Sequence, residues 1–198
     1  MAEAETKSKE TPTTETAPKT GKRAAKLQKL KKAETFNFAI DADVRAYLTQ
    51  AAHDQGLDLS HLMQKIVEGY VVETAPADTA LSVRLAAKRS VIDAVQKTAT
   101  DMDTAGKFDD HFILNVIKAS SADAAFVTAY ETATAAEGDT NKAKVKARRT
   151  RTALNQQLGR VIKRTVGARS VRKEGGGTAR SSAADALITT YTLLAKPA

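Results

Sequence analysis

The sequence predicts a mainly α-helical protein with one short strand near its N-terminus, and three observations support this fold class. Hydrophobic residues make up 42% of the 198-residue chain, but aromatic residues make up only 5% and tryptophan is absent. Small and aliphatic side chains favour slender helices over a large β core. Residues 35–40 alternate in polarity with a period of two, and helical periodicity begins directly after them.

Three classes of protein are excluded by features that the sequence lacks. There is no cysteine, which excludes disulfides and thiolate metal sites and fits a reducing compartment. No stretch approaches the ~18 unbroken apolar residues of a membrane span. Residues 1–20 lack the apolar region of a secretory signal. We therefore expect a cytoplasmic protein, nucleoid-associated if it binds DNA, with no membrane partner.

The positive charge is concentrated in two blocks, residues 19–32 and 141–173. The formal net charge of +8 divides into +4 over residues 1–34, −3 over 35–72, −5 over 73–141 and +12 over 142–198. The second block contains twelve Lys and Arg residues and no acidic residue. Such one-sided runs suit the neutralisation of phosphates and predict a nucleic-acid partner. The alternative is that each block is a solvated basic helix or tail.

Residues 1–33 are predicted to form a disordered tail and a basic arm. Residues 1–20 are rich in Thr, Glu, Lys and Pro and contain no large apolar residue after Met1, so we expect disorder. Residues 21–33 are expected to form a short helix, or an arm that becomes ordered on a polyanion.

Residues 34–73 are predicted to form a strand, a helix, a turn and a second helix. The two faces of the strand carry Phe36, Phe38 and Ile40 on one side and Thr35, Asn37 and Ala39 on the other. Asp41 suits the N-cap of the first helix, Gly56 suits its left-handed end, and Asp58 suits the next N-cap. The expected packed positions are Val44, Leu48, Ala51 and Ala52 in the first helix, Leu57 and Leu59 beside the turn, and Leu62, Met63, Ile66, Val67 and Tyr70 in the second helix.

This pattern over residues 35–71 resembles the ribbon-helix-helix family of the MetJ/Arc type. A unit of fewer than ~40 residues rarely buries enough surface to fold alone, and an unpaired strand exposes its backbone groups. Antiparallel pairing of residues 35–40 from two chains removes both problems. The resemblance therefore implies an obligate homodimer, with further assembly on DNA as an open alternative.

The resemblance also implies how double-stranded DNA would be bound. A two-stranded ribbon fits the major groove, so the outward positions Thr35, Asn37 and Ala39 become the expected base-reading residues, with Asn37 suited to adenine. Ala39 offers only an apolar contact, which weakens the expectation of strong sequence specificity. The amides of Leu59, Ser60 and His61 are implied as a phosphate anchor, with the Asp58 carboxylate competing for them. Lys29, Lys31 and Lys32 directly precede the strand and would offset the negative charge of the unit.

The remaining chain is predicted to be a linker, residues 74–80 with Pro76, and a basic helical C-terminal domain, residues 81–198. We expect helices at about residues 79–100, 109–119, 122–136, 142–166 and 183–195, the third of them capped by Ser120 and Ser121. Residues 101–107 are expected to form a loop, and residues 167–181 an irregular stretch or a hairpin. This order is compatible with a winged helix or with a helical bundle whose basic face serves oligomerisation or non-specific nucleic-acid contact.

The basic helix is expected to pack rather than to lie free. Leu154, Leu158, Val161, Ile162 and Val166 form an apolar stripe along it. The cations around this stripe are the second set of expected DNA contacts: Arg148, Arg149, Arg151, Arg160, Lys163 and Arg164.

No motif indicates an enzyme, a metal site or a cofactor. The segment EGGGT lacks the Lys-Ser/Thr pair of a phosphate-binding loop, and His53, His61 and His111 are too scattered for a metal motif. The leading hypothesis is a dimeric DNA-binding protein, either a transcriptional repressor or a plasmid or phage DNA-maintenance factor. The alternative is a helical structural or interaction protein, such as a phage scaffold or an RNA-associated protein, in which residues 35–71 only dimerise.

Overall fold

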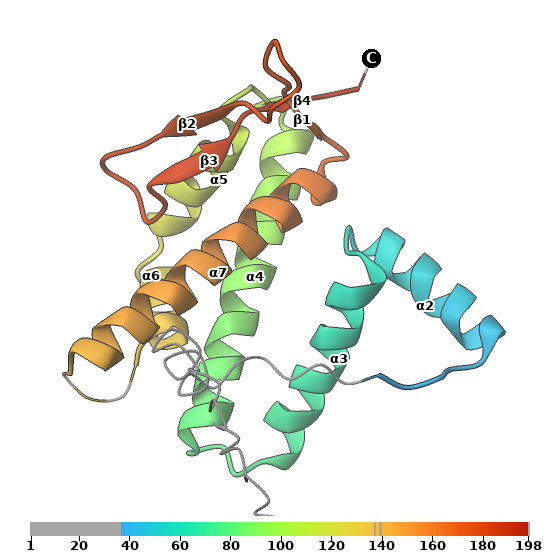
Figure 1. The fold of residues 1–198 in the computed structure, drawn as a ribbon, viewed down its shortest axis with the longest axis vertical. Coiled ribbons are helices and arrows are strands. Elements are labelled where there is room, and N and C mark those ends of the chain that lie inside the picture. Colours follow the sequence, from blue (N-terminus) through green and yellow to red (C-terminus); the bar gives the residue numbers. More distant parts are fainter. Residues whose placement is uncertain (1–36, 137, 139, 198) are drawn as a thin grey trace, which may run out of the picture. The chain divides into compact units, whose positions relative to one another are not determined.

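Six α-helices make up most of the part of the chain that the structure, a computed structural model, describes: residues 37–136, 138 and 140–197 (Figure 1). The helices are α2 (Ala42–Asp54), α3 (Leu59–Thr74), α4 (Ala80–Thr104), α5 (Phe112–Ser121), α6 (Ala124–Thr134) and α7 (Asn141–Thr165). The prediction of a mainly α fold is therefore confirmed.

Two small antiparallel ladders follow α7. Strand β1 (Arg169–Ser170) pairs with β4 (Leu194–Ala195), and β2 (Arg180–Ser182) pairs with β3 (Thr190–Thr192) in the register Arg180↔Thr192. An isolated bridge joins Arg172 to Thr178 around Gly175 and Gly176, which both have positive φ. The hairpin alternative for residues 167–181 is therefore the one observed.

The predicted helix over residues 183–195 is wrong. Ile188, Tyr191 and Leu194 are buried at a spacing of three, which imitates a helical stripe. Residues 190–192, Thr-Tyr-Thr, instead form β3 because β-branched and aromatic side chains favour a pleated, half-buried surface. The backbone of β3 is hydrogen-bonded to β2, and this long-range pairing is not visible in the local periodicity of the sequence.

Two helix boundaries also differ from the prediction. Helix α4 continues through residues 101–104, where we expected a loop, because Lys97 and Asp101 form a helical ion pair at 3.1 Å and Met102 packs against the core. Helix α6 is capped by Asp123, whose carboxylate accepts the Ala125 N–H at 2.9 Å. The serines expected as caps, Ser120 and Ser121, close the end of α5 instead.

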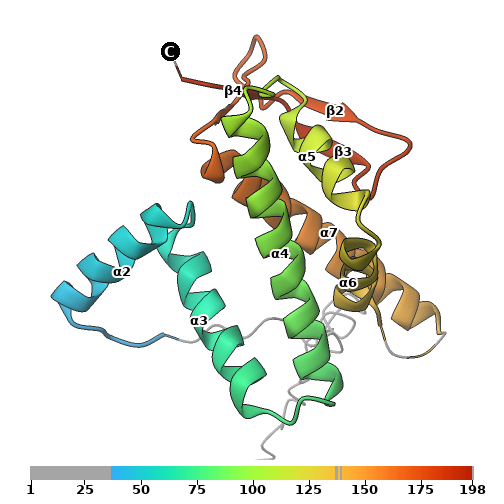
Figure 2. The same ribbon diagram turned by 180° about the vertical axis from the view of Figure 1, so that it is seen from behind.

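Helix α4 lies at the centre of the core. It contacts α3, α5, α6 and α7, and the two views show it between α3 on one side and α5 and α6 on the other (Figures 1 and 2). The core cluster contains Val91, Ile92, Val95 and Ala99 of α4, Phe112, Val116 and Ile117 of α5, Phe126 and Tyr130 of α6, and Leu154, Leu158, Val161 and Ile162 of α7.

Helices α2 and α3 are joined by the predicted turn. The Asp41 carboxylate accepts the Asp43 N–H at 2.8 Å, Gly56 has a φ of +63°, and Asp58 caps α3. These three local predictions are confirmed. The turn is held on α4 because the side-chain amide of Gln96 donates to the Gln55 carbonyl at 2.7 Å.

Helix α3 is also attached to α4 by an ion pair. Lys88 of α4 and Glu68 of α3 lie 2.6 Å apart, and both side chains are only 18% exposed. Residues Ile40–Ala198 accordingly form one compact unit. The other unit comprises Met1–Ala39, of which the structure describes Asn37, Phe38 and Ala39.

The predicted strand stays a prediction. Residues 37–40 form neither a helix nor a strand, and their side chains are exposed. A strand whose partner belongs to a second chain is not expected to be formed by one chain alone. The predicted tail and arm, including Lys29, Lys31 and Lys32, lie outside the described residues, as do Thr35 and Phe36 of the predicted strand.

Candidate nucleic-acid interface

Helix α7 presents one apolar face and one basic face. Its N-cap is Thr140, whose hydroxyl accepts the Ala143 N–H at 3.2 Å. Leu154, Leu158, Val161 and Ile162 are at most 4% exposed, so the prediction that this helix packs is confirmed. At 100° per residue, Arg149, Gln156, Arg160 and Lys163 fall on the side opposite these four residues and span about 21 Å of helix.

The cations of this basic face have few internal partners. Within residues 37–136, 138 and 140–197, no carboxylate forms an ion pair with Arg149 or Arg160 of this face. The same is true of Arg148 and Arg151, but at 100° per residue Arg148 lies on the flank of the helix and Arg151 on the side of the apolar stripe. Lys163 donates to the Ser170 hydroxyl at 3.4 Å, which leaves its charge without a described counterion. Unneutralised cations on one rigid face suit an external polyanion.

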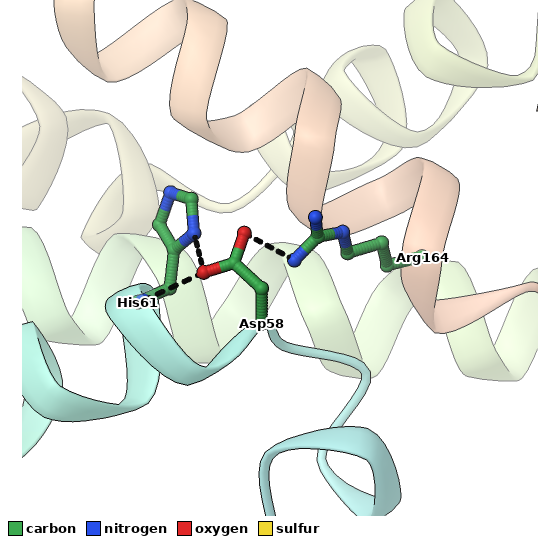
Figure 3. A network of polar contacts seen from close by, with 3 residues as sticks. All are labelled: Asp58, His61 and Arg164. Carbon is green, nitrogen blue, oxygen red and sulfur yellow. Dashed lines mark hydrogen bonds and ion pairs between the residues drawn. The ribbon is translucent and has the colours of Figure 1, made fainter. Parts of the chain in front are cut away.

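Arg164 differs from the other predicted contact residues. Its guanidinium forms an ion pair with the Asp58 carboxylate at 2.5 Å, which joins the end of α7 to the start of α3 (Figure 3). The sequence places Arg164 among the expected DNA contacts because it is one of the cations around the apolar stripe. Its ion pair with Asp58 could not be predicted, since the two residues lie far apart in the chain. The structure instead places this cation in an intramolecular contact.

Three groups surround the Asp58 carboxylate. One oxygen accepts the His61 backbone N–H at 2.8 Å and lies 2.7 Å from the His61 Nδ1 atom, while the other faces Arg164 (Figure 3). Burial by itself raises the pKa of Asp58, but the hydrogen bonds from the His61 backbone, the His61 ring and Arg164 together outweigh it. The pKa of Asp58 therefore falls from 3.8 to about 2.

This arrangement affects the implied phosphate anchor at Leu59, Ser60 and His61. The His61 amide already donates to the Asp58 carboxylate, the group that we expected to compete with a phosphate for these amides. The carboxylate also places negative charge at the helix end where a phosphate would approach. A phosphate bound there would have to coexist with Asp58 or displace it.

We expect Asp58→Asn to lower the free energy of unfolding at pH 7 by about 1 kcal/mol, since asparagine keeps the N-cap and loses the charge facing Arg164. Because folding depresses the pKa of Asp58, its contribution is complete above pH 3.8 and is lost as the pH falls through about 2. Urea titrations between pH 7 and pH 2 measure this. An equal pH dependence in the wild type and in Asp58→Asn would contradict it.

A second candidate surface is apolar and lies on α2 and α3. Several large side chains are exposed there: Val44 at 48%, Tyr47 at 74%, Ile66 at 46%, Val67 at 58% and Tyr70 at 67%. A groove of about 900 Å³ adjoins them, lined in part by Leu48, Leu62, Ile66 and Tyr70 and by Leu85 of α4. Of the positions expected to pack, Ala52 and Leu62 are buried within the single chain.

The predicted base-reading residues are described only in part. Asn37 and Ala39 are exposed, and Thr35 lies outside the described residues. Sequence reasoning missed Arg180, which stands beside α7 on β2, because its approach depends on the hairpin register. Its signal in the sequence, a lone arginine after three glycines, does not distinguish it from a solvated cation.

Comparison of the chain with family models, with curated proteins and with solved structures found no match. In the described part of the chain, no single helix has the length and apolarity needed to cross a membrane, although the bent pair α5 and α6, which meet at 104°, passes that test jointly.

Proposed function

We propose that this protein is a dimeric DNA-binding protein of the ribbon-helix-helix kind, in which two copies pair residues 35–40 and insert the ribbon into the major groove. The observation that carries the proposal is the exposed apolar surface of α2 and α3. Val44, Ile66, Val67 and Tyr70 are the positions that the family pattern reserves for packing, yet in a single chain they are between 46% and 67% exposed. A second copy of the same surface would cover them.

The basic face of α7 is proposed as a second DNA contact. It is carried on a helix whose other face is buried, so its cations are held in a fixed row. The basic face from Arg149 to Lys163 is about 21 Å long. A DNA strand advances ~3.4 Å along the helix axis per phosphate, so this length corresponds to about six phosphates. Such contacts bind without reading sequence, whereas Asn37 on the ribbon would read bases. The proposed role is repression or plasmid or phage DNA maintenance, by a nucleoid-associated cytoplasmic protein that performs no catalysis.

One observation favours a second candidate function. Asp58 occupies the start of α3, and residues 35–72 carry a net charge of −3. This negative charge repels the phosphate backbone of DNA near this unit. In that case residues 35–71 only dimerise, and the chain is a structural or interaction protein, such as a phage scaffold or an RNA-associated protein. The two candidates differ in whether Asn37 influences binding.

We expect the intact protein to bind duplex DNA with a steep salt dependence. If six to ten phosphates are contacted, affinity should fall by roughly 10³–10⁵ between 50 and 200 mM salt. Fluorescence anisotropy on random duplexes, duplexes from its own upstream region and single strands measures this. Affinity that does not change with salt would contradict the proposal.

Two variants separate base reading from backbone contact. Asn37→Ala should reduce the preference among duplexes, while Arg149→Ala combined with Arg160→Ala should weaken binding to all of them about equally. If Asn37→Ala has no effect on any duplex while the arginine variant weakens all, the second candidate function is favoured.

A further inference from the structure

A polar pocket of about 350 Å³ lies between α7 and the β2–β3 ladder. Helix α7 contributes Gln156, Arg160 and Lys163, and β2 contributes Arg180. Ile188 and Tyr191, which are 3% and 6% exposed, belong to the core and form part of its floor. The pocket therefore combines a rigid base with a polar, cationic wall.

The charge in this pocket has one sign. Arg160, Lys163 and Arg180 line it, and none of its lining residues is acidic. Across the described residues, neither Arg160 nor Arg180 nor Lys163 forms an ion pair, and the Lys163 ammonium donates to the neutral Ser170 hydroxyl. Three neighbouring cations repel one another unless an anion lies among them.

The elements that carry these cations are fixed by contacts beneath them. The Tyr130 hydroxyl donates to the Asn155 side chain at 2.7 Å, and Asn155 donates to the Leu187 carbonyl at 3.2 Å, which ties α7 to the segment before β3. The Tyr191 hydroxyl hydrogen-bonds to His111 at 2.7 Å. A ligand here would meet groups already held in place, which reduces the entropic cost of binding.

Guanidinium groups and hydroxyls match the oxygens of a phosphate in geometry and charge. The volume lies near the lower end of small-ligand sites, which suits one phosphate with its attached sugar. Thr152 and Gln156 also line a shallow depression that contains Arg148 and Arg149. The cationic surface thus continues along α7 from the pocket, as a polymer backbone would require.

We propose that this pocket is a phosphate-binding site in which Arg160, Lys163 and Arg180 hold one phosphate group of a nucleic-acid backbone. Arg180 lies outside the basic run of residues 141–173, and the hairpin brings it to the site. The inference rests on the proposed function for the source of the phosphate, while the site itself rests on the pocket. A free nucleotide carries the same chemistry and is the other source to be tested.

The experiment uses the full-length protein and the variants Arg180→Gln and Arg160→Gln. The matched control is Arg172→Gln, because Arg172 lies on the neighbouring hairpin, its guanidinium donates to the Gly176 carbonyl at 2.9 Å, and it does not line the pocket. The probes are inorganic phosphate, adenosine monophosphate and a 20-base-pair random duplex. Amide chemical shifts locate binding, anisotropy measures duplex affinity, and thermal melting checks the fold.

We expect phosphate and the nucleotide to shift the amides of Ser170, Thr190 and Thr192, and each pocket variant to weaken duplex binding about tenfold with the salt slope reduced by about one. Arg172→Gln should leave these readouts unchanged. Shifts confined to other surfaces, or pocket variants that bind all three probes like the wild type, would overturn the site.

The experiment distinguishes a nucleic-acid backbone from a free nucleotide as the source of the phosphate. It also distinguishes both from a failure of the proposed function. If the pocket variants lose nucleotide binding but keep duplex affinity, the assignment to a nucleic-acid backbone is overturned and the free nucleotide is the ligand. If the wild type binds no duplex yet phosphate shifts the pocket amides, the site stands and the proposed function fails.

Discussion

Val67→Asp is expected to give a folded monomer that binds DNA only weakly. Val67 is 58% exposed on α3, so a carboxylate there is tolerated by the single chain. In the proposed dimer the same position is covered by a second apolar surface, and burying an unpaired carboxylate costs at least roughly 3 kcal/mol. The dimer dissociation constant should therefore rise about 100-fold or more.

Sedimentation equilibrium on the wild type and the variant measures this change, with circular dichroism as the check on folding. Val145→Asp is a matched control, because Val145 is a valine of similar exposure, 49%, that lies on α7 instead. That control should remain dimeric. A wild type that is monomeric at micromolar concentration, or a Val67→Asp protein that stays dimeric, would contradict the proposed dimer.

Loss of the dimer should also remove most DNA affinity. A monomer cannot complete a two-stranded ribbon, and it brings half as many cations to one duplex. Any binding that remains in Val67→Asp should come from α7 and should fall further when Arg149 and Arg160 are replaced. Unchanged duplex affinity in a monomeric variant would assign the binding to α7 alone.

Local features of the chain were predictable from the sequence because local rules decide them. Asp41 and Asp58 cap their helices, Gly56 adopts a left-handed conformation, and the stripe through Leu158 and Ile162 is buried. Each depends on a residue type and its near neighbours.

Features set by distant contacts were not predictable. The spacing of three between Ile188, Tyr191 and Leu194 matches a helix, and only the pairing of β2 with β3 and of β1 with β4 reveals that this segment forms strands. In the sequence Arg164 does not differ from the other cations of α7, and its ion pair with Asp58 is visible only in the folded chain. Arg180 joined the candidate site for the same reason, since the hairpin register carries it to α7.

The most consequential contact of this kind joins the α2–α3 turn to the end of α7. A Cβ atom on Gly56 would lie 3.1 Å from the Thr165 Cα atom and 3.2 Å from its backbone nitrogen. The ion pair between Asp58 and Arg164 lies two residues further along the turn. The α2–α3 turn of the proposed dimerisation unit therefore contacts the C-terminal end of the basic helix, and the two should be coupled in stability.

Gly56→Ala is expected to reduce the free energy of unfolding by roughly 2–5 kcal/mol. The left-handed conformation costs a non-glycine residue about 1–2 kcal/mol. The contact with the Thr165 backbone adds roughly 1–3 kcal/mol, since the end of a packed helix cannot move aside as a side chain can. Relief of this close contact would require the α2–α3 turn or the end of α7 to move by a few tenths of an ångström, which would strain the contact between Asp58 and Arg164.

Gly167→Ala separates these two contributions. Gly167 has the same φ as Gly56, +63°, but an added Cβ meets nothing within 4 Å. Its replacement should therefore cost only the conformational part, about 1–2 kcal/mol. Urea unfolding of the two variants measures the difference, which reports how tightly the turn is held on α7. Equal destabilisation would mean that the turn moves away from α7 at little cost, and the basic helix and the dimerisation unit would then act as independent parts of the DNA-binding surface.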